Sequence, residues 1–537
     1  MKDKASVQSI VHILIWVFAA IWLFVLGVDY VNKHPAYYYV LRYFRFTGLV
    51  FQLGFIAIAI ALSRKYLPKL FSYFNTGIGL FIVGVLVSYL IIRSNSDLVT
   101  FENNSSHHLH FTTLVIASAI QLFLIILLCR NVGAIIFSKC FKKSFSPHYL
   151  IDIGLGIVLL VLIMFFLALL GVLTSYALVI VLALFLFVNP ISFYQSLGST
   201  LFKQLDTKQF SLAGLVIIFV LLAFLLVNYI SIHIPFPSGF DSRNYYVNIS
   251  NLLASSGSIV SGFPPYNGSI FIAVGLVLFE QSHLAHGMAF INIVLALLAA
   301  YAFARQILKF DADTSAIIVA MVGVTPAIAN QMFVELKVDF GLLFFQILTL
   351  ICLFDAIKKI KKSKEPRDTF KDIIKAYLPY SILLGVFIGY GLGIKMINLF
   401  LLVVIFILIG WEKNNRTLSV SVVCASIALF LFGGIDTMSG LRQYHLSANY
   451  VAMAAALIAI ITLGYSFIKV RVLALRRVVF AALISVFALL VFSPWAAKNY
   501  NDTKSLNPKT MLMGGSTGPD ISLGKIKKNY RNSQKNK

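Results

Sequence analysis

Charged residues and cysteine are both scarce in this chain of 537 residues. Only 12% of the residues are charged, against roughly 25% in soluble domains, so an ordinary soluble enzyme is excluded. The four cysteines show no CxxC spacing, which argues against a disulfide framework and against a zinc site. Acidic residues are especially few, because 20 Asp and Glu stand against 44 Lys and Arg, a net charge of +24. In a soluble chain that excess would suggest nucleic-acid binding.

Apolar residues are abundant instead, at 59% of the chain with a mean hydropathy of +0.89. A membrane-spanning helix needs about 20 mostly apolar residues. At that length the sequence predicts an all-α polytopic membrane protein with about 15 transmembrane helices, in a range of about 12 to 16. The runs lie near 8–30, 46–63, 75–93, 111–129, 149–171, 174–189, 211–233, 284–304, 314–334, 338–357, 377–394, 395–411, 418–434, 448–470 and 477–495. A further run at 268–280 is too short to span, and we expect it to be juxtamembrane or re-entrant.

The basic residues predict the orientation of these spans. With a cytoplasmic N-terminus, strict alternation places the Lys-rich block 358–376 inside, while 94–110 and 234–267 lie outside with almost no Lys or Arg. Counting 268–280 as a full span would turn the block 358–376 outward. The +24 is therefore explained by inner loops that can touch anionic lipid and by a basic tail, so no nucleic-acid partner is needed.

The order of apolar and polar stretches predicts four parts. An N-terminal bundle of about seven spans covers 1–233, and an outer loop with juxtamembrane helices covers 234–283. A C-terminal bundle of about eight spans covers 284–495, and a polar basic tail covers 496–537.

The outer loop carries the first candidate for chemistry, because a carboxylate close to the membrane is costly and usually functional. Prolines precede Asp241, and apolar residues then recur at helical spacing, at Tyr245, Ile249 and Leu252, until Gly257. This pattern predicts a short amphipathic helix on the membrane with Asp241 at its start. The plainer interpretation is that Asp241 only caps the helix.

Two further elements place charge on the predicted outer face. Glu335 and Asp339, at positions i and i+4 with Lys337 between them, would share one helical face and could point at a common ligand. The alternative is a charge cluster that marks the end of a span. Glycines at 389, 391 and 393 predict a loosened turn that delivers Lys395 to the outer side, where it could bind a lipid phosphate or simply snorkel. Weaker candidates of the same kind are Arg442 and His445.

Several short fragments occur in a fixed order over roughly 235–510, and together they resemble one family. They are Asp241-Ser242-Arg243-Asn244-Tyr245, Ser256-Gly257 with Pro264-Pro265, Asp339-Phe340-Gly341, Gly389 to Lys395, and Pro494-Trp495 with Asn499-Tyr500 and Asn507-Pro508. They are similar to motifs of the GT-C class of membrane glycosyltransferases, which includes the protein O-mannosyltransferases and the lipid A aminoarabinose transferase. The family often has Lys at the position of Phe263, Pro at Phe340 and Thr at Ile394. The seven preceding spans also depart from the usual pattern.

The resemblance implies an inverting transfer of a sugar from a polyprenyl-phosphate donor to a lipid, glycan or protein acceptor on the outer, periplasmic or lumenal, face. It implies Asp241 as general base, with Lys395, Arg243 and Arg442 at the donor phosphate. Acceptor-orienting roles, or support of a divalent cation such as Mg or Mn, would fall to Glu335, Asp339, Tyr245 and His445. The expected location is the bacterial inner membrane.

Other functions compete with this interpretation. A transporter or lipid flippase would also have broken spans, and it predicts related interruptions in the two halves. A surface-polysaccharide polymerase or ligase would rely on outer arginines and histidines, and only Arg243, Arg442 and His445 are available. A structural scaffold would leave the pattern around Asp241 unexplained.

Overall fold

The computed structural model describes residues 76–94, 105–146, 148–202, 209–233, 240–280, 282–325, 335–362, 370–411, 416–432 and 445–505. Within these ranges every regular element is a helix, and no strand occurs. Eight of the described helices are long and apolar enough to cross a membrane, or nine if one bent pair counts as a span. The described chain therefore has the helices of a multi-pass integral membrane protein.

Helix contacts divide the described chain into two compact units. The first comprises the residues up to Ser258 and from Gly268 to Lys362, and the second comprises Ile259–Asn267 and the residues from Phe370 on. This grouping differs from the predicted bundles, because helices within 284–365 pack with the preceding helices rather than with the following ones. The predicted membrane modules 1–233 and 284–495, with the loop 234–283 between them, stay predictions.

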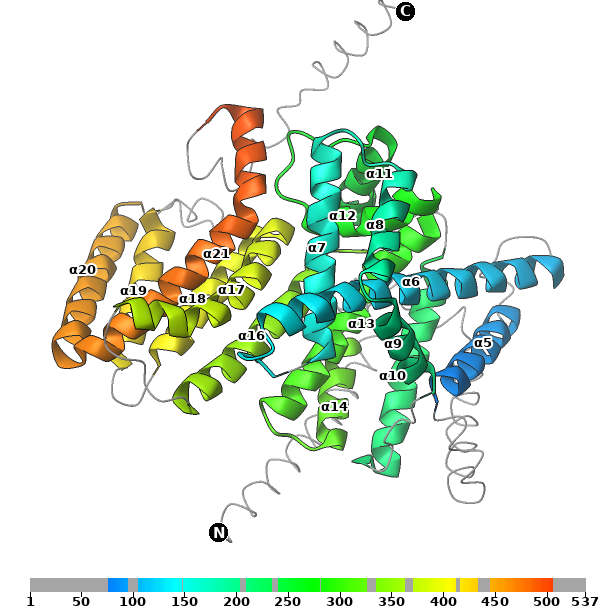
Figure 1. The fold of residues 1–537 in the computed structure, drawn as a ribbon, viewed down its shortest axis with the longest axis horizontal. Helices are drawn as coiled ribbons and strands as arrows, with labels where there is room; N and C mark the ends of the chain where they lie inside the picture. The colour runs from blue at the N-terminus through cyan, green and yellow to red at the C-terminus, as the bar shows by residue number, and fades with distance from the viewer. Residues whose placement is uncertain are drawn as a thin grey trace, which may run out of the picture. The chain divides into compact units, whose positions relative to one another are not determined.

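The first unit is built around two long crossing helices, which Figure 1 shows in cyan. Its helices are α5 (Gly77–Ser94), α6 (Ser105–Cys140), α7 (Tyr149–Leu169), α8 (Ser175–Phe187), α9 (Pro190–Phe202), α10 (Leu212–Ser231), α11 (Val247–Ser256), α12 (Asn267–Phe279), α13 (Ser282–Gln306), α14 (Ala312–Gly323) and α16 (Asp339–Lys362). The first residue of α12, Asn267, is grouped with the second unit. Helices α6 and α7 approach closely because Gly133 and Gly156 lie at their crossing, where a Cβ on either would overlap the partner backbone.

Several first-unit helices begin at side-chain caps that the local sequence supplies. The side chains of Thr174, Ser211 and Asp311 accept hydrogen bonds from backbone amides in the first turns of α8, α10 and α14. The short apolar run predicted at 268–280 is the 13-residue helix α12, and the structure buries Ile270–Val277 within the protein. Its predicted juxtamembrane or re-entrant position stays a prediction.

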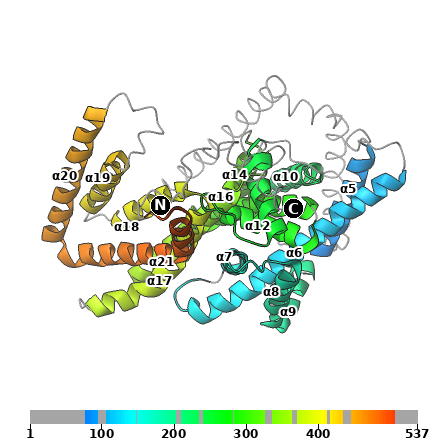
Figure 2. The ribbon, with the colours of Figure 1, turned by 90° about the horizontal axis from the view of Figure 1, so that it is seen from above.

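The second unit is a bundle in which α17 runs along α21 (Figure 2). Its helices are α17 (Phe370–Ile394), the single 3-10 turn η4 (Met396–Asn398), α18 (Leu399–Gly410), α19 (Arg416–Phe432), α20 (His445–Lys469) and α21 (Arg471–Thr503). Many apolar side chains on α20 are exposed, among them Ile460 and Ile468. An exposed apolar helix face of this kind fits contact with lipid.

The glycines of α17 have a different role from the predicted one. They lie inside a continuous helix, and the chain breaks only at Lys395, which has an extended backbone. A Cβ at Gly385 or Gly389 would overlap residues of α21, including the Ala488 backbone. Gly385 and Gly389 therefore let α17 and α21 approach closely, whereas a Cβ at Gly391 or Gly393 would overlap the side chain of Asn398 or Asn267.

Candidate functional site

The segment that follows Asp241 is a short helix, as the sequence predicts, but it begins with a wide turn. Residues Ser242–Tyr246 form a π-helical turn that continues into α11. The helix ends at Gly257, whose left-handed φ of 63° favours glycine. The predicted end of the helix is confirmed, because a glycine that ends a helix is recognised from the residues next to it.

The residues of the predicted apolar face differ in their burial within the protein, and the position of this face against the membrane stays a prediction. Ile249 is buried, but Tyr245 and Leu252 are exposed, and the buried face is completed by Val247 and Leu253 instead. A π turn has more residues than an α turn, so it shifts the residues before α11 relative to those within it. Tyr245 therefore does not continue the face that contains Ile249.

Asp241 does not act as a side-chain cap. Its backbone is helical, with φ −66° and ψ −39°, and its side chain makes no capping hydrogen bond. A capping residue needs an extended backbone to turn its side chain back toward the first amides, so the helical angles explain the missing cap. The Asp241 carboxylate instead forms an ion pair, with its Oδ2 atom 2.7 Å from Nζ of Lys337.

The partner segment is a tight turn before α16, not a helix. The Lys337 amide donates a hydrogen bond of 2.5 Å to the Glu335 carbonyl, which closes a three-residue turn. The expectation that Glu335 and Asp339 share a helical face is therefore wrong, because α16 begins only at Asp339. The Glu335 carboxylate accepts hydrogen bonds from the Ser242 amide at 3.2 Å and the Ser242 hydroxyl at 3.4 Å.

The turn and the π-helical segment thus make two contacts between neighbouring residues. Asp241 contacts Lys337, and Ser242 contacts Glu335, so the two segments are held together at two neighbouring positions. The Lys337 pKa lies above its usual value because its ammonium is hydrogen bonded to Asp241 and because Glu335 adds negative charge. The Lys337 side chain is 24% exposed and that of Asp241 is 44% exposed, so both remain open to a ligand.

The other predicted site residues stand as follows. Tyr245 lies in the π-helical turn, and its ring meets the Tyr246 ring edge-on at a centroid distance of 6.0 Å. Asp339 lies in the first turn of α16, where a carboxylate suits the helix dipole. Lys395 belongs to the second unit and starts η4.

The remaining candidates are described only in their backbone or not at all. Arg243 lies in the π-helical turn and His445 begins α20, but their side chains lie outside the described set. Arg442 lies outside the described residues altogether. In the described ranges, no group of three or more His, Cys, Asp and Glu side chains is arranged to hold a metal ion.

Lys337 is not among the residues assigned a role from the sequence. The alternation of Glu335, Lys337 and Asp339 shows that the segment is charged, but it does not reveal a partner almost a hundred residues earlier. The structure supplies that partner in Asp241. A carboxylate in this position can accept a proton from a hydroxyl. The ammonium beside it can neutralise an anionic oxygen.

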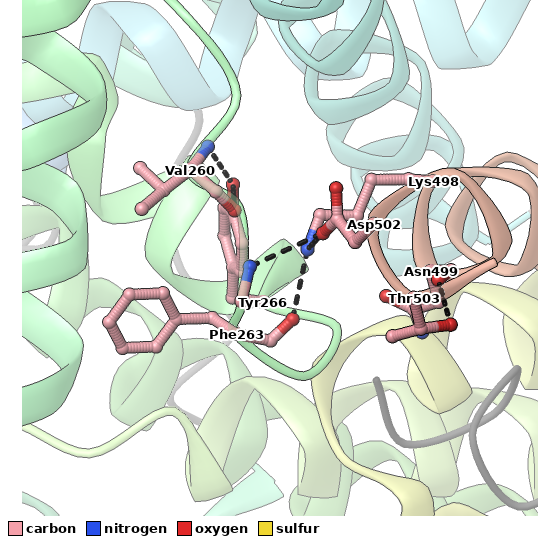
Figure 3. Close-up of polar contacts among 8 residues, drawn as sticks. Val260, Phe263, Tyr266, Lys498, Asn499, Asp502 and Thr503 are labelled. Atoms are coloured by element: carbon pink, nitrogen blue, oxygen red, sulfur yellow. Dashed lines mark hydrogen bonds and ion pairs between the residues drawn. The ribbon is translucent and has the colours of Figure 1, made fainter. Parts of the chain in front are cut away.

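A second polar cluster lies in the second unit and was also missed. Helix α21 continues to Thr503, beyond the predicted end of the span at 495, so part of the predicted tail is helical. In Figure 3, Lys498 reaches from α21 to the Phe263 carbonyl, which its Nζ meets at 3.0 Å. Lys498 also pairs with Asp502 at 2.9 Å, and Asp502 accepts a hydrogen bond from the Gly262 amide at 3.2 Å.

Aromatic residues complete this cluster around the segment 259–267. The Tyr266 ring lies edge-on to Trp495, and the Tyr266 hydroxyl accepts from the Val260 amide at 2.7 Å. The Trp495 indole donates to Asn267 at 2.8 Å, and the Asn267 amide donates to the Tyr390 carbonyl at 3.0 Å. The cluster fastens the Pro-Pro segment to α21 and α17, and its polar groups are satisfied by one another.

Comparison of the chain with protein-family models, with curated proteins and with solved structures gave no match.

Proposed function

We propose that the protein is a GT-C-type membrane glycosyltransferase that moves a sugar from a polyprenyl-phosphate donor to an acceptor, with inversion at the anomeric carbon. The observation that carries the proposal is the contact between Asp241 and Lys337. The first of the fragments that resemble the family begins at Asp241, and this residue is an exposed, ion-paired carboxylate instead of a helix cap. The π-helical turn beside it supports the assignment, since such turns are frequent at functional sites.

The proposed step divides between the two oxygens of Asp241. Lys337 contacts Oδ2, so Oδ1 is the atom that we assign as the proton acceptor. As the acceptor hydroxyl gives its proton to Oδ1, its oxygen bonds to the anomeric carbon of the sugar. The bond between that carbon and the phosphate oxygen breaks on the opposite side, and the electron pair leaves with the phosphate.

Cations are needed where the phosphate develops charge. Lys337 is the cation that lies beside the proposed base, and Lys395, Arg243 and Arg442 are further donor-phosphate ligands in the proposal. Glu335 is held by Ser242, which suits it to support the geometry of the site rather than to contact the donor. Asp339, Tyr245 and His445 are proposed to line the acceptor side, and a divalent cation such as Mg or Mn could assist there.

The proposal includes a membrane arrangement. About 15 spans, a GT-C bundle in the C-terminal half, a cytoplasmic N-terminus and a site on the outer face of the bacterial inner membrane would fit the charge pattern. A reporter fused after residue 366 should then read cytoplasmic. An external signal would overturn the topology and the outer site with it.

The catalytic test uses purified protein with a labelled polyprenyl-phosphate sugar. We expect release of the lipid phosphate, and we expect Asp241→Asn to lower turnover by about 10³-fold, within the range for loss of a general base. The matched control is Asp355→Asn, which changes another aspartate that pairs with a lysine, at 3.7 Å, in the same unit. Full turnover in Asp241→Asn, or an equal loss in the control, would refute the assignment.

A transporter or flippase of lipid-linked sugar is the second candidate, and one observation favours it. Helices α8 and α9 are joined by a bend of 84° near Pro190, so a broken segment exists in the first unit as well as at Lys395 in the second. In sealed vesicles, a transporter would move labelled donor across the membrane without releasing lipid phosphate.

A further inference from the structure

One end of the second unit carries cations from four helices, and we name this group of residues the basic rim. Its exposed members are Lys371 and Lys375 on α17, Arg416 on α19, Lys469 on α20 and Arg471 on α21. Two buried members, Arg476 and Arg477, follow on α21. Among the described residues at this end, Asp372 is the one carboxylate. The basic rim therefore has a large excess of positive charge.

Contacts between α17 and α21 bring the first turns of these two helices to the same end. The Tyr377 ring stacks on the Phe480 ring at a centroid distance of 5.0 Å. Further along both helices, Gly389 lies against Ala488, so α17 and α21 run in the same direction (Figure 1). The cations in their first turns therefore lie at one end of the unit.

Helices α19 and α20 add their cations to the same end through a pair of hydroxyls. The side-chain oxygens of Thr417 and Ser466 lie 2.7 Å apart, which ties the first turn of α19 to the last turn of α20. The Ser421 hydroxyl donates to the Ala459 carbonyl at 2.8 Å, so these two helices are antiparallel. Only Val470 separates α20 from α21. The four helix ends therefore lie together.

Two features fit the basic rim to the level of lipid headgroups. The 33 residues of α21 extend about 50 Å, more than the roughly 40 to 45 Å of a bilayer with its headgroups, so a charged end of this helix can lie among them. The Arg416 guanidinium lies 5.3 Å from the centroid of the Trp411 ring, and the Lys469 ammonium lies 5.6 Å from that of Tyr465. Trp and Tyr beside Lys and Arg are typical of a membrane–water interface.

The helix dipoles add to the charge of the basic rim instead of offsetting it. The N-terminus of a helix has a partial positive charge, and α17, α19 and α21 all begin at the rim. The first turns of α19 and α21 contain no acidic residue. The positive potential of the clustered Lys and Arg is therefore reinforced, and an anion bound there would be stabilised.

We propose that the basic rim binds the headgroup phosphate of an anionic phospholipid. Its exposed Lys and Arg side chains contact the phosphate oxygens, and the buried arginines keep a positive potential behind them. The acyl chains lie along α20, where Leu457, Ile461 and Ile468 are exposed at helical spacing, and this apolar face selects a lipid over a free phosphate. The rim lies at the opposite end of α17 from Lys395, so it is separate from the proposed donor-phosphate ligands and does not depend on the proposed sugar transfer.

Binding of fluorescently labelled phosphatidylglycerol to the full-length protein in a neutral detergent tests the proposal. We expect saturable binding, measured as a rise in fluorescence anisotropy, that unlabelled phosphatidylglycerol displaces and that phosphatidylcholine at the same concentration does not. Equal displacement by the two lipids would overturn the assignment of an anionic headgroup. Equal displacement by inorganic phosphate, at the same concentration and constant ionic strength, would overturn the assignment of a lipid.

Charge variants locate the binding. Lys469→Gln with Arg471→Gln removes two exposed cations of the basic rim, and each cation near an anionic lipid contributes about fivefold, so binding should weaken by about 25-fold. Lys469→Arg with Arg471→Lys keeps both charges and should bind within about twofold of wild type. The control, Lys139→Gln with Lys142→Gln, removes two exposed lysines of the first unit and should leave binding unchanged. Full binding in the first variant, an equal loss in the control, or loss of binding in the charge-preserving variant contradicts the proposal.

Discussion

The buried ion pair of α21 gives a prediction that can be worked from its surroundings. The Lys498 side chain is 3% exposed and that of Asp502 is 15% exposed, so both charges lie largely out of water. Breaking a buried pair leaves one uncompensated charge, which typically costs about 3 to 5 kcal/mol. Because Asp502 keeps some access to water, we expect Asp502→Ala to lower the free energy of unfolding by about 3 kcal/mol.

The remaining ligands of Lys498 do not replace the lost carboxylate. The Phe263 carbonyl still accepts at 3.0 Å, and the Tyr266 and Trp495 rings lie 5.9 and 5.8 Å from the ammonium. These groups carry dipoles and quadrupoles, not a full negative charge. Removing both charges should be milder, so Lys498→Met combined with Asp502→Leu should stay within about 1 kcal/mol of wild type.

A double-mutant cycle measures this difference. Denaturant unfolding in detergent, followed by tryptophan fluorescence, gives the free energy of unfolding for Lys498→Met, for Asp502→Leu and for the variant that combines them. We expect a coupling energy of about 2 kcal/mol or more between the two positions. A cost of less than about 0.5 kcal/mol for Asp502→Ala, or a double variant as unstable as Asp502→Leu alone, would contradict this account of the ion pair.

Two further predictions concern other parts of the molecule. Gly389→Val should lower the free energy of unfolding by about 1 to 3 kcal/mol, because its side chain would overlap the Ala488 backbone. Gly464→Ala, which has open space around it, should be neutral or slightly stabilising in the same unfolding assay. Lys337→Met should change stability by no more than about 0.5 kcal/mol, because the pair is partly exposed, but should lower release of lipid phosphate by about 10²-fold; unchanged turnover would remove Lys337 from the proposed site.

The sequence by itself determined where most of the described helices lie. Apolar length alone predicts α7, α10 and α13 close to their observed bounds, and Gly257 marks the end of α11. These features depend on residues a few positions apart, so the local pattern contains the necessary information.

Only the tertiary structure decided which side chains meet. The pairing of Asp241 with Lys337 and that of Lys498 with Phe263 join residues far apart in the chain, and no spacing rule indicates them. The same holds for Gly389, whose role depends on the α21 surface that faces it. The physical reason is that local periodicity reports which face of a helix is apolar but not which partner covers it. The charge and hydrogen-bonding role of each side chain is set by that partner.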